Sequence, residues 1–218
     1  MNMSKIAYLF LAGECPDPWH EDLSDTDALL VAVDGGYVHL RRLGLKADIL
    51  MGDFDSITAE HYAELARMGT EVIRWPREKD NSDSDLACGE LYRRGYSLLY
   101  LFGALGGTRF DHALGNIGMM HLWKRRGLRI VLLQGNLHAE VLSQESVLLR
   151  GNSGDLISLL PLTPEVTSVS TNGLKFTLNQ ESLYAGESRS LSNCFITERI
   201  CLEVGEGSLL LMHYRTGR

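Results

Sequence analysis

The feature that most constrains the fold of this chain is a change in its hydrophobic pattern near residue 137. Before that point, short apolar runs of strand length alternate with amphipathic segments of helical length. After it, the pattern consists of short alternating segments with turn residues between them. Strand–helix alternation is typical of a mostly parallel sheet covered by helices on both faces, whereas closely spaced short strands indicate an all-β domain. The sequence therefore predicts two architectures in succession.

The first region contains apolar runs that we expect to form strands. These runs are Ile6–Leu11, Leu29–Val33, Asp48–Met51, Glu71–Trp75, Ser97–Phe102 and Arg129–Leu133. Three of the segments between them, Thr58–Met68, Asp83–Arg94 and Asp111–Arg126, have helical period. Each is followed closely by a glycine, the usual residue at the C-terminal end of a helix. We therefore expect a mostly parallel α/β sheet domain over residues 1–136.

The second region has turn signals in place of helical period. They are Asn152–Asp155, Asn172-Gly173 and Gly205–Gly207. Because no helix is indicated here, we predict an all-β, sandwich-like domain over residues 137–218. The predicted fold class is thus α/β plus all-β.

Charge and composition exclude several classes of protein. The formal net charge is −7 and the basic residues form no long tract, which argues against a nucleic-acid binder. No apolar run approaches the roughly 18–20 residues needed to span a membrane. The first apolar run suits a buried strand better than a signal peptide, so we expect a cytoplasmic protein. The four cysteines form no CxxC pair, which favours reduced thiols over a zinc site or disulfides.

Aspartates follow consecutive predicted strands. They are Asp34, Asp53, Asp55, Asp80, Asp83, Asp85 and Asp111. In a parallel sheet the segments that follow strands emerge at one edge, so these carboxylates are expected to converge. Carboxylates placed together repel one another unless a cation neutralises them. Oxygen ligands without a His or Cys cluster favour Mg²⁺ over zinc, so the sequence predicts a magnesium site.

Simpler interpretations exist for individual members of this set. Asp34 before two glycines fits a turn, and Asp53 with Asp55 fits a solvated loop. Ser82 and Asp85 have the spacing of a capping box, and for Asp85 capping is the preferred interpretation. These alternatives do not explain why the acids collect after consecutive strands, so the convergence carries the argument.

A glycine-rich segment, residues 103–112, joins a predicted strand to a predicted helix. Gly106 and Gly107 allow close approach of a ligand to the backbone, and Arg109 adds a forked donor suited to phosphate. The segment is neither a Walker A loop nor a GxGxxG fingerprint. An ordinary glycine-rich turn is the alternative, but beside the acidic edge we interpret it as a phosphate-binding loop. His112 has the chemistry of an acid or base, but a residue this early in a helix can also simply point to solvent. No nucleophile elbow is present, so a covalent mechanism has little support.

Five motifs occur in order along the chain: Asp34-Gly-Gly36, Gly52-Asp-Phe-Asp-Ser56, Lys79-Asp-x-Ser-Asp83, Gly106-Gly-x-Arg-Phe-Asp-His112 and Ser192-Asn193. Together they resemble the motif series of the thiamin pyrophosphokinase family, over nearly the whole chain. The resemblance implies an N-terminal domain that binds ATP and Mg²⁺ and a C-terminal β domain that binds thiamin and dimerises. It implies transfer of the diphosphate group of ATP to the hydroxyl of thiamin, with AMP as the other product. It also implies a homodimer.

The resemblance assigns roles by position. The metal ligands are Asp53, Asp55, Asp80 and Asp83, and the ATP and phosphate contacts are Asp34, Gly35, Gly36, Ser56, Gly106, Gly107 and Arg109. The thiamin contacts are Asp111, His112, Ser192 and Asn193. The residues implied in catalysis are Asp53, Asp55, Asp83, Arg109 and Asp111.

The chain departs from the family pattern in three places. Ser82 stands where the family usually has Thr, and Asp85 where it often has Glu. All three tryptophans lie in the first region, so Phe195 and Tyr214 are the candidates for an aromatic that stacks on thiamin. Three rival functions remain: a diphosphokinase acting on a hydroxymethyl pterin, a metal-dependent phosphohydrolase, and a non-catalytic module that senses nucleotide or thiamin.

Overall fold

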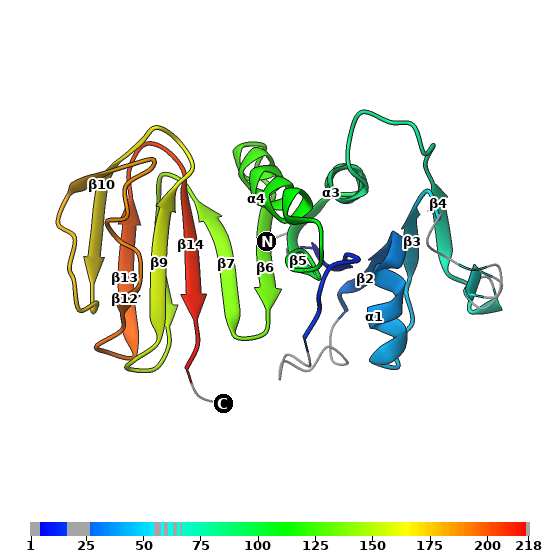
Figure 1. Cartoon of the computed structure of the whole chain (residues 1–218), viewed down its shortest axis with the longest axis horizontal. Helices are drawn as coiled ribbons and strands as arrows, with labels where there is room; N and C mark the ends of the chain where they lie inside the picture. Colours follow the sequence, from blue (N-terminus) through cyan, green and yellow to red (C-terminus); the bar gives the residue numbers. More distant parts are fainter. Residues whose placement is uncertain are drawn as a thin grey trace. The chain divides into compact units, whose positions relative to one another are not determined.

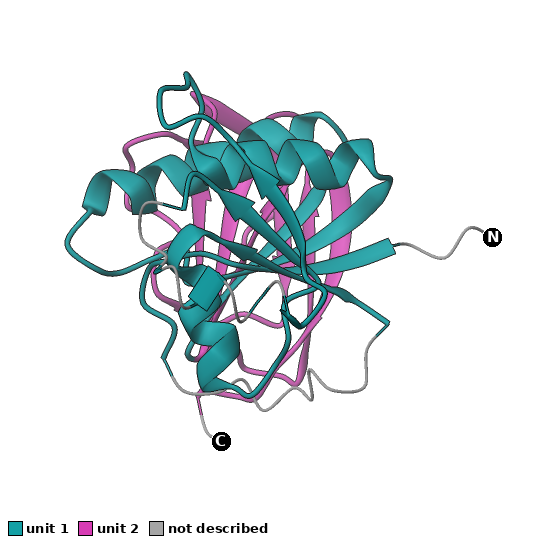
Figure 2. Cartoon of the chain, turned by 90° about the vertical axis from the view of Figure 1, so that its right-hand side faces the viewer, with its two compact units in different colours: residues 1–135 teal, residues 136–218 magenta. Residues whose placement is uncertain are grey.

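The computed structural model describes residues 5–16, 27–54, 58, 61–62, 65 and 67–216. The chain forms two compact units, residues 1–135 and 136–218, which are distinguished by colour in Figure 2. Two residues of the predicted site, Asp55 and Ser56, lie outside the described residues.

Unit 1 is built on a parallel sheet with the strand order β6-β5-β1-β2-β3-β4. The strands are β1 (Lys5–Phe10), β2 (Leu29–Val33), β3 (Ile49–Gly52), β4 (Glu71–Arg74), β5 (Tyr96–Phe102) and β6 (Arg129–Gln134). Helices cover both faces of the sheet and bury much of the apolar runs of its inner strands, as in β3, where all four residues are buried. The edge strand β4 has no buried residue. On the central strands, the rings of Phe10 and Phe102 stack with 4.6 Å between centroids.

The direction of each crossover determines which face of the unit 1 sheet its helix covers. The 3-10 turn η2 (Asp34–Gly36) and α1 (Tyr37–Arg42) lead from β2 to β3, whereas α3 (Asp83–Arg93) and α4 (Phe110–Arg125) lead to β5 and β6 on the other side of β1. Right-handed crossovers in opposite directions place helices on opposite faces, an arrangement visible in Figures 1 and 2. The direction reverses between β1 and β5, which is where open α/β sheets bind ligands.

Local sequence explains where the two long helices begin and end. Ser82 is the N-cap of α3, and its Oγ accepts a hydrogen bond from the backbone N–H of Asp85 at 3.3 Å. Gly95 and Gly127 follow α3 and α4 with φ of 84° and 90°, left-handed values that favour glycine. No described helix of the chain is long and apolar enough to cross a membrane.

Unit 2 consists of two antiparallel sheets with the orders β12-β9-β14-β7 and β11-β10-β13-β8. The strands are β7 (Leu137–Leu142), β8 (Glu145–Arg150), β9 (Leu156–Pro161), β10 (Glu165–Asn172), β11 (Glu181–Tyr184), β12 (Asn193–Cys194), β13 (Arg199–Val204) and β14 (Leu209–Tyr214). Inward side chains of both sheets, among them Leu159, Leu211, Val166 and Leu202, form one buried hydrophobic cluster. This is sandwich packing.

The fold class predicted from the sequence is confirmed, including the absence of helix from the described part of unit 2. The predicted helix Thr58–Met68 is only partly described, and within it His61, Tyr62, Leu65 and Arg67 are helical. The prediction did not include α1, which is short and starts directly at the Asp-Gly-Gly segment. All four cysteines lie in the described part of the chain, and none of them is in a disulfide.

Candidate active site

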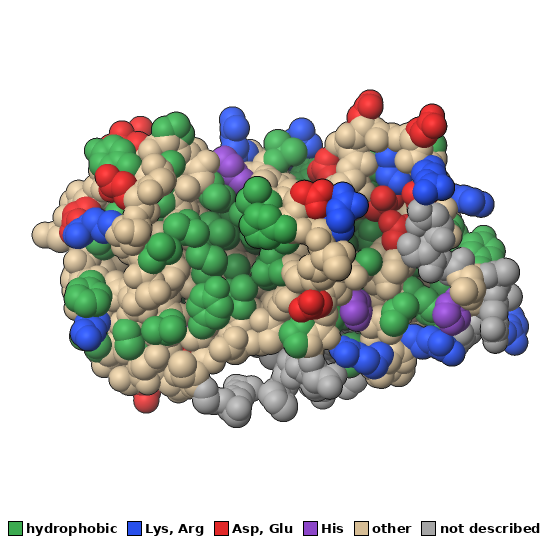
Figure 3. All heavy atoms as spheres, in the orientation of Figure 1, with side chains coloured by type: hydrophobic (Ala, Val, Ile, Leu, Met, Phe, Trp, Pro, Cys, Tyr) green, Lys and Arg blue, Asp and Glu red, His purple; other side chains and the backbone are tan. Residues whose placement is uncertain are grey.

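Three aspartates and one lysine meet at the carboxyl end of the unit 1 sheet, and we call this group the acidic edge: Asp34, Asp53, Lys79 and Asp83. Asp34 follows β2, Asp53 follows β3, and Asp83 begins α3 after the loop from β4. On the face of unit 1 seen in Figure 3, acidic and basic side chains lie side by side. The sequence prediction that acids from separate strands converge therefore holds for the three described aspartates of this group.

Asp34 is held in an unfavourable environment for a negative charge. Burial, together with the nearby charges of Asp83 and Asp53, raises its pKa from 3.8 to about 6. The hydrogen bond from the Phe54 backbone and the charge of Lys79 act in the opposite direction. Burial is the largest cause of this shift, and repulsion from the neighbouring carboxylates adds to it.

The Asp-Gly-Gly and Gly-Asp-Phe segments interlock through the Asp34 side chain. Its Oδ1 accepts hydrogen bonds from the backbone N–H groups of Asp53 at 3.1 Å and Phe54 at 3.4 Å. A Cβ at Gly52 would lie 1.8 Å from that same oxygen, and one at Gly36 would lie 1.8 Å from the Phe10 carbonyl oxygen. Only glycine fits at these positions. Close packing therefore explains the glycines of these two motifs, apart from any role in binding a ligand.

Lys79 bridges two of these carboxylates. Its ammonium lies 2.8 Å from Asp83 Oδ1 and 3.7 Å from Asp53 Oδ2. Burial alone would lower the pKa of Lys79, but Asp83, Asp53 and Asp34 together hold it above its ordinary value. Lys79 is therefore a firmly charged cation within the acidic edge.

The other acids near the start of α3 differ in their surroundings. Asp80 is exposed. Asp85 accepts hydrogen bonds from Asn81 Nδ2 and, at 2.7 Å, from Trp123 Nε1, so its carboxylate is engaged with neighbouring side chains. Since Ser82 caps the helix and its hydroxyl receives the Asp85 N–H, half of the predicted capping box is present. Among Asp80, Asp83 and Asp85, it is Asp83 that forms an ion pair with Lys79.

Within the described residues, no group of three or more His, Cys, Asp or Glu side chains is arranged to hold a metal ion. The donor chemistry of the acidic edge nevertheless fits a hard divalent cation, because it consists of carboxylate oxygens. The Lys79 ammonium lies between the carboxylates of Asp53 and Asp83, so this position stabilises a positive charge. Asp53 and Asp83 are the described residues best placed to hold such an ion.

The glycine-rich loop after β5 is bound to the segment after β1, at the point where the crossover direction reverses. Gly13 and Glu14 donate backbone hydrogen bonds to the carbonyls of Gly103 and Leu105. Glu14 Oε1 accepts a hydrogen bond from the Gly107 N–H at 3.0 Å. The loop predicted to bind phosphate therefore already holds a carboxylate, and sequence reasoning did not identify Glu14.

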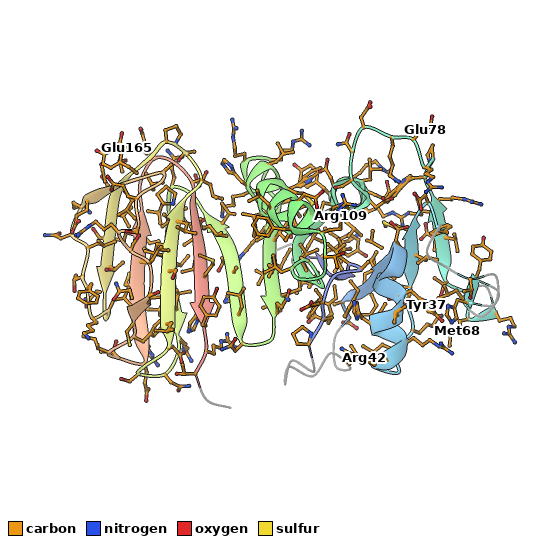
Figure 4. The ribbon with its side chains drawn as sticks, in the orientation of Figure 1. Tyr37, Arg42, Met68, Glu78, Arg109 and Glu165 are labelled. Atoms are coloured by element: carbon orange, nitrogen blue, oxygen red, sulfur yellow. The ribbon has the colours of Figure 1, made fainter. Side chains whose placement is uncertain are left out.

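Arg109 and Asp111 form a two-pronged ion pair at the start of α4. Arg109 Nε and Nη2 donate to Asp111 Oδ1 and Oδ2 at 2.9 and 2.7 Å. Figure 4 labels Arg109 at this end of the helix. The guanidinium holds the pKa of Asp111 down at about 2. Both side chains, and His112 beside them, are exposed, so this pair is accessible to a ligand.

The Ser192-Asn193 segment lies in unit 2, and its two residues differ in role. Asn193 is buried; its Oδ1 accepts from the backbone N–H groups of Phe176 and Cys194 at 3.0 and 2.9 Å, and its Nδ2 donates to the Phe176 carbonyl at 2.7 Å. Ser192 is exposed and has a left-handed φ of 55°. The Asn193 side chain thus fastens two backbone segments together.

The two aromatic candidates for stacking on thiamin also differ. Phe195 is fully buried, and its ring stacks on His213 with 4.7 Å between centroids. His213 in turn contacts the buried Asp155 at 2.8 Å. Phe195 is therefore part of the unit 2 core, which argues against a role in stacking on a ligand. Tyr214, at the end of β14, is half-buried.

Unit 1 thus has the architecture of an open α/β protein with an acidic site at the carboxyl ends of its strands, and unit 2 is an antiparallel sandwich. Two family models match the chain in the same order. Thiamin pyrophosphokinase, catalytic domain, matches residues 20–132, and Thiamin pyrophosphokinase, vitamin B1 binding domain, matches residues 145–209.

Individual relatives agree with these matches. The chain is 27% identical over 190 residues to a thiamine pyrophosphokinase of Bacillus subtilis, covering 87% of this chain and 88% of the relative. It is 32% identical over 182 residues to thiamine pyrophosphokinase 1 of Oryza sativa subsp. japonica, covering 79% and 67%. This chain belongs to the thiamin pyrophosphokinase family, as its motifs predicted.

Solved structures share the fold over 98% of the chain. The crystal structure of thiamine pyrophosphokinase from Bacillus subtilis has a TM-score of 0.86 and 26% identity, covering 98% of this chain and 100% of that one. Thiamin pyrophosphokinase from Candida albicans has a TM-score of 0.80 at 16% identity, covering 98% and 90%, and at that identity it supports the fold alone.

Proposed function

We propose that this chain is an enzyme that transfers the diphosphate group of ATP to the hydroxyl of thiamin, giving thiamin diphosphate and AMP. The observation that carries the proposal is the meeting of Asp34, Asp53 and Asp83 at one edge of the sheet in a chain of this family. Transfer to phosphorus depends on positioning and charge neutralisation more than on covalent help from the protein, and a carboxylate edge supplies the ligands for the cation it requires.

The residues of unit 1 divide this work. Asp53 and Asp83 would hold Mg²⁺, with Asp55 and Asp80 as further ligands. Mg²⁺ would supply the positive charge that neutralises phosphate oxygens. Asp34 fixes the turn that carries Asp53, through hydrogen bonds to the Asp53 and Phe54 backbone.

The phosphate and acceptor contacts complete the proposed site. Arg109 would direct its forked guanidinium to phosphate oxygens, with Asp111 orienting it. Either Asp111 or a metal-held water would accept the proton of the thiamin hydroxyl. Further ATP contacts are proposed at Gly35, Gly36, Ser56, Gly106 and Gly107, and further thiamin contacts at His112, Ser192 and Asn193. We also propose that the enzyme works as a cytoplasmic homodimer, with the thiamin site and the dimer contact provided by unit 2.

A panel of acceptors tests the choice of substrate. The purified protein is incubated with ATP and Mg²⁺ plus thiamin, a hydroxymethyl pterin, or no acceptor, and AMP is quantified. We expect AMP formation that requires thiamin. AMP formed with the pterin instead would favour the rival diphosphokinase, phosphate or pyrophosphate released without an acceptor would favour a phosphohydrolase, and binding without turnover would favour a sensing module.

A further inference from the structure

Lys79 places a positive charge between two carboxylates that come from different parts of unit 1. Asp53 follows strand β3, whereas Asp83 is the first residue of helix α3, and the Lys79 ammonium contacts both. The side chain is only 13% exposed, and the ammonium also donates to the Pro76 carbonyl oxygen at 3.2 Å. Lys79 is therefore held in place by two ion pairs and one hydrogen bond to a carbonyl oxygen rather than extended into solvent.

The acidic edge needs such a charge. Its three carboxylates repel one another, which an added cation relieves. The ammonium of Lys79 supplies such a charge from within the chain. An ammonium is one unit of charge on a flexible stem, so it can be replaced by an ion of higher charge that binds the same oxygens directly.

We propose that Lys79 is a built-in counter-cation of the acidic edge, which holds Asp53 and Asp83 in place until a divalent cation binds and then gives way to that cation. The inference rests on the proposed function. It makes Lys79 a positioning residue: it acts on the reaction through the two carboxylates and sets how tightly they take the metal ion.

Two opposite effects follow from this role. Without Lys79, the carboxylates of the metal-free protein repel one another unrelieved, so the fold should be less stable. The same carboxylates no longer have an internal competitor, so they should bind a divalent cation more tightly. A lysine that merely braced the α3 loop would show the first effect without the second, because loss of a brace would loosen the metal ligands too.

The test compares Lys79→Met, which removes the charge, with Lys79→Arg, which keeps it. Lys46→Met is the matched control, since Lys46 is an exposed lysine of the same unit. Melting temperature is measured in EDTA, and Mg²⁺ affinity is measured by calorimetry in the absence of nucleotide. If Lys79→Met does not fold in EDTA, Lys79→Gln, which retains a hydrogen-bond donor for Asp83, takes its place.

We expect Lys79→Met to melt at a lower temperature in EDTA and to bind Mg²⁺ roughly tenfold more tightly than the parent, since a neighbouring unit charge commonly shifts the charging of such a site by one pK unit or more. Lys79→Arg and Lys46→Met should resemble the parent. Unchanged or weaker Mg²⁺ binding in Lys79→Met and Lys79→Gln would overturn the inference. Because these readouts need no turnover, they are independent of whether the parent forms AMP with thiamin.

Discussion

The carboxylate of Glu14 accepts a hydrogen bond of 3.0 Å from the backbone N–H of Gly107. The two residues follow β1 and β5, the central strands between which the crossover direction reverses. Gly106 packs closely against this carboxylate, since a Cβ at Gly106 would be 2.7 Å from the Glu14 side chain. A phosphate that binds the glycine-rich loop must therefore displace Glu14 or lie against its negative charge.

Glu14→Gln should improve the use of ATP. The amide keeps an oxygen acceptor for Gly107 but removes the charge that opposes a phosphate. We expect the apparent KM for ATP to fall about threefold to tenfold, because an exposed charge contact amounts to about 1 kcal/mol. The KM for thiamin should change little. A higher KM for ATP in Glu14→Gln would show instead that the charge assists nucleotide binding.

Arg109→Lys should impair turnover even though the charge is kept. Lysine cannot reproduce the planar fork that now grips Asp111 through two nitrogens and that suits a phosphate equally well. We expect kcat to fall by at least about tenfold, which is less than the roughly hundredfold cost of losing a whole transition-state donor because the positive charge remains. Steady-state kinetics measures this, with Arg93→Lys as a control at another exposed ion-paired arginine. Equal kcat in Arg109→Lys and the parent would remove Arg109 from contact with phosphate.

Asp34 should make the folded protein less stable as the pH rises. Its pKa in the folded protein, about 6, is above the ordinary value of 3.8, so folding favours the protonated form. The stabilisation from Asp34 is thus fully present below about pH 4 and is lost as the pH rises through about 6. Asp34→Asn, which mimics the neutral form, should escape that loss.

Melting curves in EDTA between pH 4 and pH 8 measure the effect. The melting temperature of Asp34→Asn, taken relative to the parent, should rise between pH 4 and pH 7, whereas Asp27→Asn, a change at an exposed aspartate, should keep a constant difference. If the melting-temperature difference between Asp34→Asn and the parent also stayed constant with pH, folding would not disfavour the charged form of Asp34.

The fold and the position of the site were predictable for a common reason. Buried parallel strands are continuous apolar runs, and Asp34 and Asp53 stand directly after two of them, so the sheet topology alone brings them together. The glycines of the same motifs follow from close contacts, such as Gly52 against Asp34. These features depend on residues adjacent in sequence to a strand end.

The partners of the site residues were not predictable in the same way. Glu14 contacts Gly107 from another segment of the chain, and a lone Glu in a loop carries no pattern. Lys79 opens one of the five motifs, but the motif does not reveal its contact with Asp53, which lies in another segment. Asn193 was assigned to thiamin by resemblance, yet its three hydrogen bonds to backbone give it a structural role that the sequence could not distinguish. Asp55 and Ser56 lie outside the described residues and remain predictions.

Single substitutions at Ser192 and at Asn193 should have different effects on stability and on thiamin binding. Asn193→Ala leaves buried backbone groups without partners, so we expect a loss of stability of at least about 1–3 kcal/mol. Ser192→Ala changes an exposed side chain and should stay within about 0.5 kcal/mol of the parent. If Ser192 contacts thiamin, its loss should raise the KM for thiamin and leave that for ATP unchanged. Denaturant melts and paired titrations measure both, and a stable Asn193→Ala variant would contradict the bracing role.

The central claim concerns which group is transferred, and the nucleotide product decides it. The protein is incubated with ATP, Mg²⁺ and thiamin, and both products are quantified by chromatography and phosphorus NMR. We predict AMP and thiamin diphosphate in equal amounts, because the thiamin hydroxyl attacks the β-phosphorus of ATP. ADP with thiamin monophosphate, or AMP released without any thiamin ester, would contradict the account.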